Sequence, residues 1–305
     1  SSSPIAPPLV ELAKKLELGE IPLSIREFRK IAPEISEAPT KAIEKLKGDA
    51  ILTINSVSAS YDQDQTSKAL NDVNIQINGG EIVALMGRNG AGKTTLLKCA
   101  VAQAPLTNGE VRVNQRDPKS FTDKELIRFV GYIPQDAGDL LYGQSIKQEC
   151  DLADFDNEVE PGTTLAIYQE LMKIPSLNAH PRDISEGQRL GLALSIILSA
   201  QPALVILDEP TRGLDYEAKK VLIKILKQIA SSLDRAVLIS THDVELVAEV
   251  ADRVIFLADG EVIADGSSRE VLKASPAFAP QVSKALPNNS WLSLSDVERY
   301  LSEKN

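Results

Sequence analysis

The chain has few cysteines and fewer basic than acidic residues. Only Cys99 and Cys150 among its 305 residues are cysteines, and its 33 Lys and Arg are outnumbered by 43 Asp and Glu. Two cysteines cannot build a disulfide framework, which fits a reducing compartment. Because phosphate backbones are bound by clustered Lys and Arg, a formal net charge of -10 argues against a nucleic-acid partner.

Long apolar runs are also lacking. A helix that spans a membrane needs about 20 consecutive apolar residues. The nearest candidate, residues 190–207, is uncharged but is interrupted by two serines, a glutamine and a proline. We therefore predict a buried helix, a break and a buried strand over this stretch.

The chain begins at Ser1, without Met and without the charged and apolar regions of a signal peptide. We therefore expect a fragment or a processed product of a longer protein. With 43% hydrophobic residues, the chain has enough apolar material for one large domain or two small ones.

Short β-rich runs alternate with helical segments from Ile51 onward. Residues 1–48 are rich in Pro, Glu and Lys, with helical patterns at 9–18 and 25–31, and the helix-rich stretch 139–198 divides the β-rich runs into two sets. Because strands that alternate with helices form parallel sheets covered on both faces, we predict a parallel sheet with a helical insertion. The predicted strands are residues 51–57, 73–77, 82–86, 111–113, 129–133, 203–207, 236–240, 254–257 and 262–264, and the later helices are residues 216–232 and 244–250.

A glycine-rich motif follows the predicted strand 82–86. Residues 87–94 read GRNGAGKT, which fits the pattern G-x-x-x-x-G-K-[ST]. The glycines let the backbone curl so that its N–H groups point at phosphate oxygens, and the following helix N-terminus adds positive potential. Lys93 would reach the terminal phosphates, and the Thr94 hydroxyl would bind Mg²⁺. An ordinary glycine turn needs neither side chain, so the motif predicts a nucleoside-triphosphate site.

Polar side chains follow three further strands. The apolar run 204–207 ends in Asp208 and Glu209, which could hold Mg²⁺ and polarise an attacking water. Gln135 could reach both the metal and the water, and His242 could hydrogen-bond the γ-phosphate. Solvated acids at a strand end and a structural histidine are the alternatives. The phosphate loop upstream, and the strand-end positions where α/β sheets place their sites, favour a catalytic role.

With these motifs in this order, the sequence resembles the ATP-binding cassette (ABC) ATPases. Residues 184–188, ISEGQ, are similar to the family's signature LSGGQ, and residues 213–215, GLD, are similar to the loop after the paired carboxylates. Tyr61, 26 residues before the phosphate loop, resembles the aromatic residue that stacks on adenine; an exposed loop tyrosine is the alternative. The resemblance covers about residues 51–272. It implies an α/β P-loop NTPase fold with a RecA-like core, a mostly parallel sheet, an antiparallel β part and an inserted helical subdomain.

The resemblance also implies an ATPase that uses ATP and Mg²⁺. Glu209, His242 and Gln135 would be catalytic, with Glu209 as the general base. Thr94, Gln135 and Asp208 would hold Mg²⁺. The implied nucleotide-binding residues are Tyr61, Gly87, Arg88, Asn89, Gly90, Ala91, Gly92, Lys93, Thr94, Thr95, Ser185, Gly187, Gln188 and Asp215.

Two cassettes of this family pair head to tail, so that each ATP lies between one cassette's phosphate loop and the other's signature. Ser185 and Gly187 would therefore face an ATP bound by a second cassette. Glu186 departs from the family pattern because it replaces the first glycine of the signature. A carboxylate near a triphosphate repels it, although an acid at a helix N-terminus is favourable in itself. We expect the site completed by this signature to be altered or weaker but still active, because Ser185 and Gly187 are retained.

The two ends of the chain resemble each other. Residues 3–10, SPIAPPLV, are echoed by residues 275–282, SPAFAPQV, and residues 22–29 are echoed by residues 291–299. The first pair is offset by 272 residues (275 minus 3), about one cassette plus one tail. We therefore expect the first copy to be the tail of another ABC ATPase domain, N-terminal to Ser1 in the same polypeptide. Chance similarity between short Pro- and Ala-rich segments is the alternative.

Such tails resemble those of the tandem ATPase subunits of energy-coupling factor (ECF) transporters, which import vitamins and metal ions in prokaryotes. This resemblance implies a transmembrane scaffold subunit, a substrate-binding membrane protein, and a peripheral location at the cytoplasmic face of the cell membrane. Arginine-bearing helices of the scaffold would dock beside Gln135, where an acidic run could receive them; an ordinary solvated face is the alternative. The acids of the run are Glu149, Asp151, Asp154, Asp156, Glu158 and Glu160.

The predicted organisation is a tail of a preceding ATPase domain (1–48), an ABC ATPase domain (49–272) and a C-terminal helical tail (273–305). Within the ATPase domain, residues 139–199 form the helical subdomain and the remainder, 49–138 and 200–272, the core. Two other interpretations stay open. One is a conventional ABC importer or exporter cassette with accessory flanks. The other is a soluble regulatory or translation-associated ABC protein, a class with charged linkers and basic surfaces that match this chain poorly. The transported substrate is not encoded here, because its pocket would lie in another chain.

Overall fold

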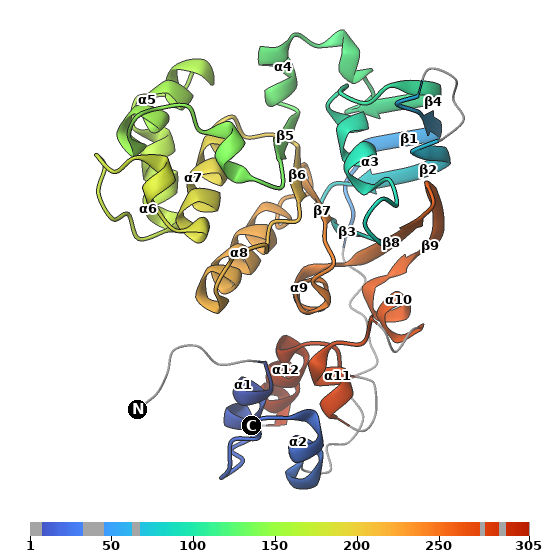
Figure 1. Cartoon of the computed structure of the whole chain (residues 1–305), viewed down its shortest axis with the longest axis vertical. Helices are drawn as coiled ribbons and strands as arrows, with labels where there is room; N and C mark the ends of the chain where they lie inside the picture. The colour runs from blue at the N-terminus through green and yellow to red at the C-terminus, as the bar shows by residue number, and fades with distance from the viewer. Residues whose placement is uncertain (1–7, 33–45, 63–67, 275–277, 287–290, 305) are drawn as a thin grey trace.

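The computed structural model describes residues 8–32, 46–62, 68–274, 278–286 and 291–304. A body of two sheets carries a helical insertion on one side, and a small group of helices from both ends of the chain lies below it (Figure 1). None of the helices in these ranges combines the length and the apolarity that crossing a membrane requires.

The main sheet is mostly parallel. Within the described ranges its spatial order is β5 (Val130–Ile133), β6 (Leu204–Asp208), β7 (Ala236–Ser240), β3 (Ile82–Met86), β8 (Arg253–Ala258) and β9 (Glu261–Ser267). Neighbouring strands from β5 to β8 pair in parallel, and β9 at the edge pairs antiparallel with β8. β3, β6 and β7 are buried along their whole length, because both faces of the sheet are covered. The predicted strands and the parallel sheet are confirmed.

A second, antiparallel sheet supplies the predicted antiparallel β part. Its order is β2 (Leu70–Asn78), β1 (Ala50–Ala59) and β4 (Leu106–Val113). One apolar cluster joins Leu52 of this sheet, Leu96 of α3 (Lys93–Ala100) and Leu238 of the main sheet. The two sheets therefore share one core, with α3 packed between them.

Helices dominate between β5 and β6 and extend away from the sheets (Figure 1). Tyr168 is fully buried in their own apolar cluster with Ile146 and Leu192, and its hydroxyl donates to the Gln188 carbonyl at 3.1 Å. The uncharged stretch 190–207 forms the end of α7, a break and β6, as predicted. The elements between β5 and β6 are η2 (Ala137–Leu140), α5 (Ile146–Asp156), α6 (Thr163–Leu171), η3 (Pro181–Asp183) and α7 (Glu186–Ser199), whereas η1 (Pro118–Ser120) and α4 (Asp123–Ile127) lie between β4 and β5.

Helices α8 (Tyr216–Ile229) and α9 (Val244–Val250) cover the face of the main sheet opposite α3. Alternation along β7 explains the two layers. Ile239 packs in the cluster that contains α8, whereas Leu238 packs in the cluster that contains α3, because successive side chains of a strand point to opposite faces. Helix α10 (Ser268–Ala274) follows β9 directly.

Both ends of the chain contribute to a separate bundle, which we call the helical group. It consists of α1 (Pro8–Lys15), α2 (Ile25–Ile31), α11 (Gln281–Ala285) and α12 (Leu294–Lys304). Phe28 from one end and Trp291 from the other are buried in one apolar cluster, and the Trp291 ring meets Tyr300 edge-on at 5.1 Å between centroids. Of the predicted tail 1–48, residues 1–7 and 33–45 lie outside the described residues.

We predict that Phe28→Ala loosens the helical group. Phe28 is fully buried, and truncating a buried phenylalanine costs about 3–5 kcal/mol. Trp291, the single tryptophan of the chain, lies in the same cluster, so its fluorescence during urea unfolding reports on this group. Phe155→Ala is the matched control, because Phe155 is 77% exposed and its loss should change stability by no more than about 0.5 kcal/mol. Equal midpoints for both variants would contradict the assignment of this core.

Candidate nucleotide-binding site

The predicted phosphate loop joins β3 to α3. Gly92 is the N-cap of α3 with φ of +99°, and a Cβ on it would lie 2.3 Å from the carbonyl oxygen of Ala69. Only glycine fits a position that is both left-handed and crowded. The Lys93 side chain is buried, and its Nζ donates to the carbonyl oxygens of Gly87 and Arg88 at 2.8 and 3.2 Å. The loop therefore holds the ammonium group at the N-terminal end of α3, where a phosphate is favoured.

Parallel pairing brings the other predicted residues to the same edge. The carboxyl ends of β5, β6, β7 and β3 lie side by side, so the residues that follow these strands meet there. The Oδ2 atom of Asp208 accepts a hydrogen bond from Thr94 Oγ1 at 2.8 Å, although the two residues are 114 positions apart. Gln135 lines the same cavity. A hydroxyl, a carboxylate and an amide oxygen form a donor set that suits Mg²⁺, so these three residues fit the predicted metal.

Glu209 has a strained backbone and two polar partners. Its φ is +49°, a value uncommon outside glycine that clusters at functional sites. Its amide donates to the Ser240 carbonyl at 2.8 Å. Its Oε2 lies 2.7 Å from His242 Nδ1, and its Oε1 lies 4.0 Å from Lys93 Nζ. The Glu209 side chain is 12% exposed and that of His242 is 78% exposed. The carboxylate is thus held in place while the imidazole is open to a ligand.

One open cavity of about 740 Å³ joins these groups, a size that suits a small-molecule ligand. Tyr61, 62% exposed, forms part of its wall. The other loop residues Gly87, Arg88 and Ala91 are not in the lining. The predicted residues that line the cavity are Tyr61, Asn89, Gly90, Gly92, Lys93, Thr94, Thr95, Gln135, Asp208, Glu209 and His242.

The signature residues lie outside this cavity. Ser185 and Gln188 form a capping box that starts α7, with Gln188 Oε1 accepting from the Ser185 amide at 3.1 Å. Gly187 packs against α8, since a Cβ on it would lie 2.8 Å from the Ala218 Cβ. Asp215 caps α8 by accepting from the Ala218 amide at 2.8 Å. Their contacts with a nucleotide remain predictions that require a second cassette.

Glu186, the departure in the signature, is paired within the chain. Its Oε1 accepts from Arg189 Nη1 at 2.8 Å, and the Arg189 side chain is only 18% exposed because it also donates to the carbonyls of Pro181 and Arg182. The stem of Glu186 lies against Gly213, where a Cβ would come within 3.1 Å of Glu186 Cγ. The extra carboxylate is thus partly neutralised by a fixed arginine, which reduces the repulsion expected from the sequence.

Two features of the site escaped prediction. Arg212 lines the cavity, and its position just after the paired acids was the only signal. Lys219 of α8 donates to Asp243 Oδ2 at 2.6 Å. Burial acts to raise the pKa of Asp243, but hydrogen bonds from Lys219 and from backbone outweigh it, so the pKa lies below its ordinary value. The Lys219–Asp243 pair thus links α8, the helix that Asp215 caps, to the residue that follows His242.

The acidic run between residues 149 and 160 is not one surface. Glu149 and Asp154 are each 4% exposed. Glu149 accepts from the Gly143 amide, and burial raises its pKa. The Asp154 carboxylate accepts from the amides of Gly162 and Thr164 at 2.6 and 2.8 Å. The interpretation of the whole run as a docking face is therefore wrong for these two acids, which close loops of the helical insertion.

Fold and site together define a P-loop NTPase of the ABC type. A sequence profile described as ABC transporter matches residues 70–212. A protein of Clostridium acetobutylicum, assigned by its name to the ATP-binding proteins of ABC transporters, is 33% identical over 225 residues, which cover 72% of this chain and 80% of that protein. The chain therefore belongs to the ABC transporter family, as one of its ATPase domains.

Other relatives are longer than this chain. Proteins of Streptomyces avermitilis and Streptomyces coelicolor with the same kind of name are each 40% identical, over 331 and 334 residues, which cover 99% and 98% of this chain. The chain spans 59% of the length of each.

Solved structures confirm the fold class. The protein cbiO1 from Clostridium perfringens, part of the ABC transporter complex cbiONQ, is 27% identical with a TM-score of 0.66 over 79% of this chain and 98% of that one. An ATP-binding cassette solved as a dimer with ADP and phosphate shares the fold, with 24% identity and a TM-score of 0.63 over 71% of this chain and 98% of that one.

We predict that Asp208→Asn weakens ATP binding only when Mg²⁺ is present. Its carboxylate and the Thr94 hydroxyl are 2.8 Å apart and would share the ion, so the affinity for a fluorescent ATP analogue should fall at least about tenfold in Mg²⁺ and stay unchanged in EDTA. Asp259→Asn, at an exposed turn, is the control and should bind as the parent does. An equal loss in EDTA would argue against a metal role for Asp208.

Proposed function

We propose that this chain is the ATP-binding and hydrolysing subunit that energises a membrane importer, of the ECF type that takes up vitamins or metal ions. One observation carries the hydrolytic part of the proposal. The Glu209 carboxylate is held by His242 and approached by Lys93, at the edge where Thr94 and Asp208 meet. A fixed base, a phosphate-binding cation and a metal-binding pair thus converge on one cavity.

ATP would lie along this cavity with its adenine against Tyr61 and its phosphates on the loop amides and Lys93. Thr94, Gln135 and Asp208 would hold Mg²⁺, which neutralises phosphate charge when bound.

Glu209 would act as the general base. A water attacks the γ-phosphorus, the bond to the β–γ bridging oxygen breaks, and the water's proton passes to the Glu209 carboxylate. His242, within 2.7 Å of that carboxylate, would donate a hydrogen bond to the γ-phosphate as its charge develops.

A second ABC cassette completes both ATP sites in this proposal. The signature lies outside the chain's own cavity, so Ser185 and Gly187 would serve an ATP bound elsewhere. The Streptomyces relatives are longer than this chain, which spans 59% of their length. Together with the echo between the two ends of the chain, this supports a tandem protein whose other cassette lies N-terminal to Ser1.

A transmembrane scaffold subunit would dock in the groove between the sheets and the helical insertion. This groove has a cavity volume of about 760 Å³ and is lined by Ile127, Tyr142, Leu152 and Asp156. Tyr142 is 81% exposed and Leu152 is 43% exposed, and large apolar residues gathered at a surface mark partner sites. An apolar scaffold helix with an arginine for Asp156 fits this groove. The scaffold would join a substrate-binding membrane protein, and this chain would lie at the cytoplasmic face of the membrane.

Two other functions compete with this proposal. One is a conventional ABC importer or exporter ATPase, and the other is a soluble regulatory or translation-associated ABC protein. Purification of the native protein in mild detergent separates them. A scaffold and a small substrate-binding membrane protein in the complex support the ECF proposal, and other transmembrane partners support a conventional transporter. Ribosomes, or no partner, would overturn transport.

We predict that Glu209→Gln retains ATP but loses turnover. Without the base, ATP hydrolysis by the assembled complex should fall at least about 100-fold, while affinity for ATP stays within a few-fold. Phosphate release and equilibrium binding measure the two quantities. Glu170→Gln, an exposed glutamate on α6, is the control. Unchanged hydrolysis by the Glu209 variant would refute its role.

We predict that Glu186→Gly accelerates the ATP site that this signature completes. In the tandem protein, Glu209→Gln inactivates the ATP site that contains this chain's own phosphate loop. The residual ATP hydrolysis then comes from the site that this signature completes. Glu186→Gln separates charge from bulk, because only a charge effect is relieved by both substitutions. Arg189→Met should slow hydrolysis by unmasking the carboxylate 2.8 Å away, and should have no effect when combined with Glu186→Gly. A decrease in the Glu186→Gly variant would contradict a repulsive role.

A further inference from the structure

The helical group contains two copies of one helix pair, α1–α2 and α11–α12. In the first copy, Ser24 Oγ accepts from the Glu27 amide at 3.2 Å, and Glu27 Oε2 accepts from the Leu23 amide at 2.8 Å. In the second copy, Ser293 Oγ accepts from the Asp296 amide at 3.2 Å, and the Asp296 carboxylate accepts from the amide of the residue before Ser293 at 3.0 Å. The residue after each acid is apolar and fully buried. Residues 3–7 and 275–277 of the echo lie outside the described residues, and the described part of the echo is a structural repeat.

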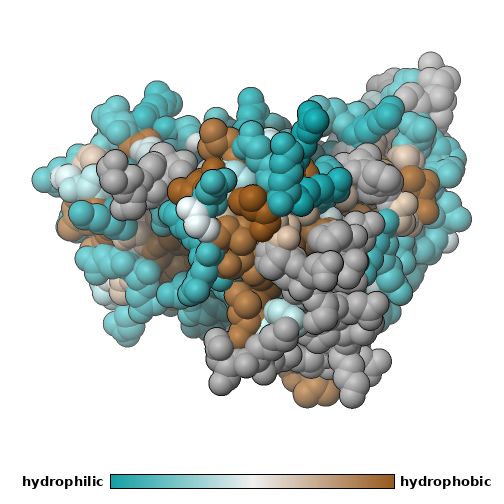
Figure 2. Space-filling view, turned by 90° about the horizontal axis from the view of Figure 1, so that it is seen from below, coloured by the Kyte–Doolittle hydropathy of each residue, from teal (hydrophilic) through white to brown (hydrophobic). Residues whose placement is uncertain are grey.

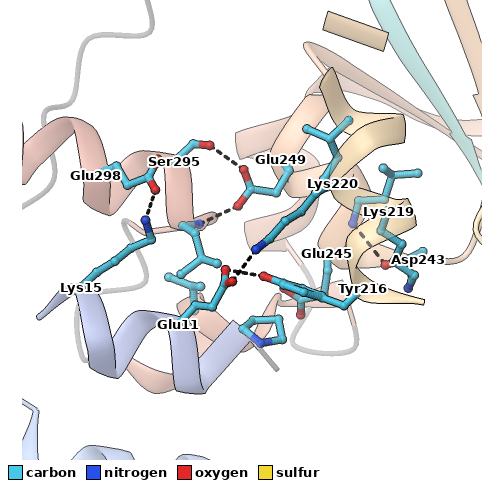
Figure 3. A pocket seen from close by; sticks show the side chains of 15 residues that line it. Glu11, Lys15, Tyr216, Lys219, Lys220, Asp243, Glu245, Glu249, Ser295 and Glu298 are labelled. Atoms are coloured by element: carbon cyan, nitrogen blue, oxygen red, sulfur yellow. Dashed lines mark hydrogen bonds and ion pairs between the residues drawn. The ribbon is translucent and has the colours of Figure 1, made fainter. Parts of the chain in front are cut away.

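The second copy is seated on α9 of this cassette. Leu292 is 3% exposed and belongs to an apolar cluster with Val247 and Ala251. Glu245 accepts from the first amide of α11 at 2.7 Å. Glu249 accepts from the first amide of α12 at 2.7 Å and from the next side chain, a serine hydroxyl, at 2.6 Å (Figure 3). Helix α9 therefore presents two carboxylates one turn apart beside an apolar cluster, and both helices of the copy receive a carboxylate.

The first copy presents the equivalent surface to solvent. Leu23, the counterpart of Leu292, is 85% exposed, and Ile21 is 56% exposed. A hollow of about 410 Å³ lies there, lined by the first turns of α1 and α2, the loop before α2, and α11. Arg26 is exposed, and its counterpart in the second copy is Ser295, whose hydroxyl donates to Glu249. Apolar surface is visible next to hydrophilic residues at this end of the molecule (Figure 2).

The first copy is also fixed to the cassette, through other residues. Glu11 of α1 accepts from Lys220 Nζ at 2.6 Å and from the Tyr216 hydroxyl, both on α8 (Figure 3). Leu23 is therefore exposed although its helix pair is already docked on α8. The surface around Leu23 is available to a further partner.

We propose that Ile21, Leu23 and Arg26 form the docking surface for the helix of a second ABC cassette that corresponds to α9. This inference rests on the proposed function for the existence of that cassette and adds the surface that holds it. The partner helix carries two carboxylates four positions apart, as Glu245 and Glu249 are placed on α9, and an apolar patch lies beside them. The apolar patch covers Leu23, and a carboxylate pairs with Arg26.

A second copy of this chain does not fit this surface as well. Its own α9 is covered by its own Leu292, which is 3% exposed, so the matching helix is not available. A cassette with the same family fold and its own free α9 face fits instead. The helical group would then bind one cassette on each copy of the repeat.

Photo-crosslinking in the full-length native protein tests this surface. A benzophenone amino acid placed at position 23 should form an adduct with the second cassette, within the helix that aligns with residues 244–250, identified by peptide mass spectrometry. Leu46, 78% exposed and outside the helical group, is the matched control and should give no adduct there. An adduct with a second copy of this cassette or with a membrane subunit, or no adduct at position 23, overturns the proposal.

Charge and bulk at the surface give an independent test. Leu23→Asp should raise the rate of proteolytic release of the second cassette at least about tenfold, whereas Leu46→Asp should leave it unchanged. Equal rates overturn the proposal. ATP hydrolysis and co-purification with membrane subunits are measured on the same samples. If these persist without an adduct, the docking surface is wrong and the proposed function stands; if the native protein holds no second cassette, both fail.

Discussion

The parallel pairing of β6, β7 and β3 is the constraint on which the site depends. Asp208 lies opposite Ser240 in the β6–β7 register, and β7 in turn pairs with β3, which leads into the phosphate loop. A slip of one residue would turn the Asp208 side chain to the other face of the sheet and separate it from Thr94. The continuous burial of these strands stabilises this register, because a slip would also misplace every apolar side chain in the two covering layers.

Helix α8 connects that edge to the rest of the molecule. Asp215 caps the start of α8, and Ala218 contacts the glycine of the signature. Lys219 pairs with Asp243, the acid that follows His242. Lys220 reaches the helical group through Glu11. One rigid helix thus contacts the signature, the histidine turn and the helical group. A shift of the helical group relative to the sheet would be transmitted to the signature segment and to the turn at His242, because close-packed interiors transmit strain.

Much of the fold and most of the site could be predicted because their signals are local. The loop 87–94 follows its strand and precedes its helix directly, and strands 82–86 and 236–240 and helix 244–250 have the predicted bounds. The prediction that the acidic run forms a docking face was wrong for its two buried acids, because their contacts are not local. Nothing near Glu149 in the sequence shows that loop amides surround it, and a run of acids has the same pattern whether it is solvated or buried. The pairing of Lys219 was not predicted for the same reason, since its partner, Asp243, caps a different helix.

By itself, the sequence determined most of the strands and helices and predicted which of them would carry phosphate, metal and catalytic chemistry, because periodicity, glycine loops and helix caps act over a few residues. Only the tertiary structure decided which distant groups meet. It pairs the unusual Glu186 with Arg189, which partly neutralises the carboxylate, and it gives the two copies of the terminal repeat different environments. Leu292 is buried and Leu23 is exposed although their local sequences are alike, because burial depends on which distant surface packs against a residue and not on its neighbours in the chain.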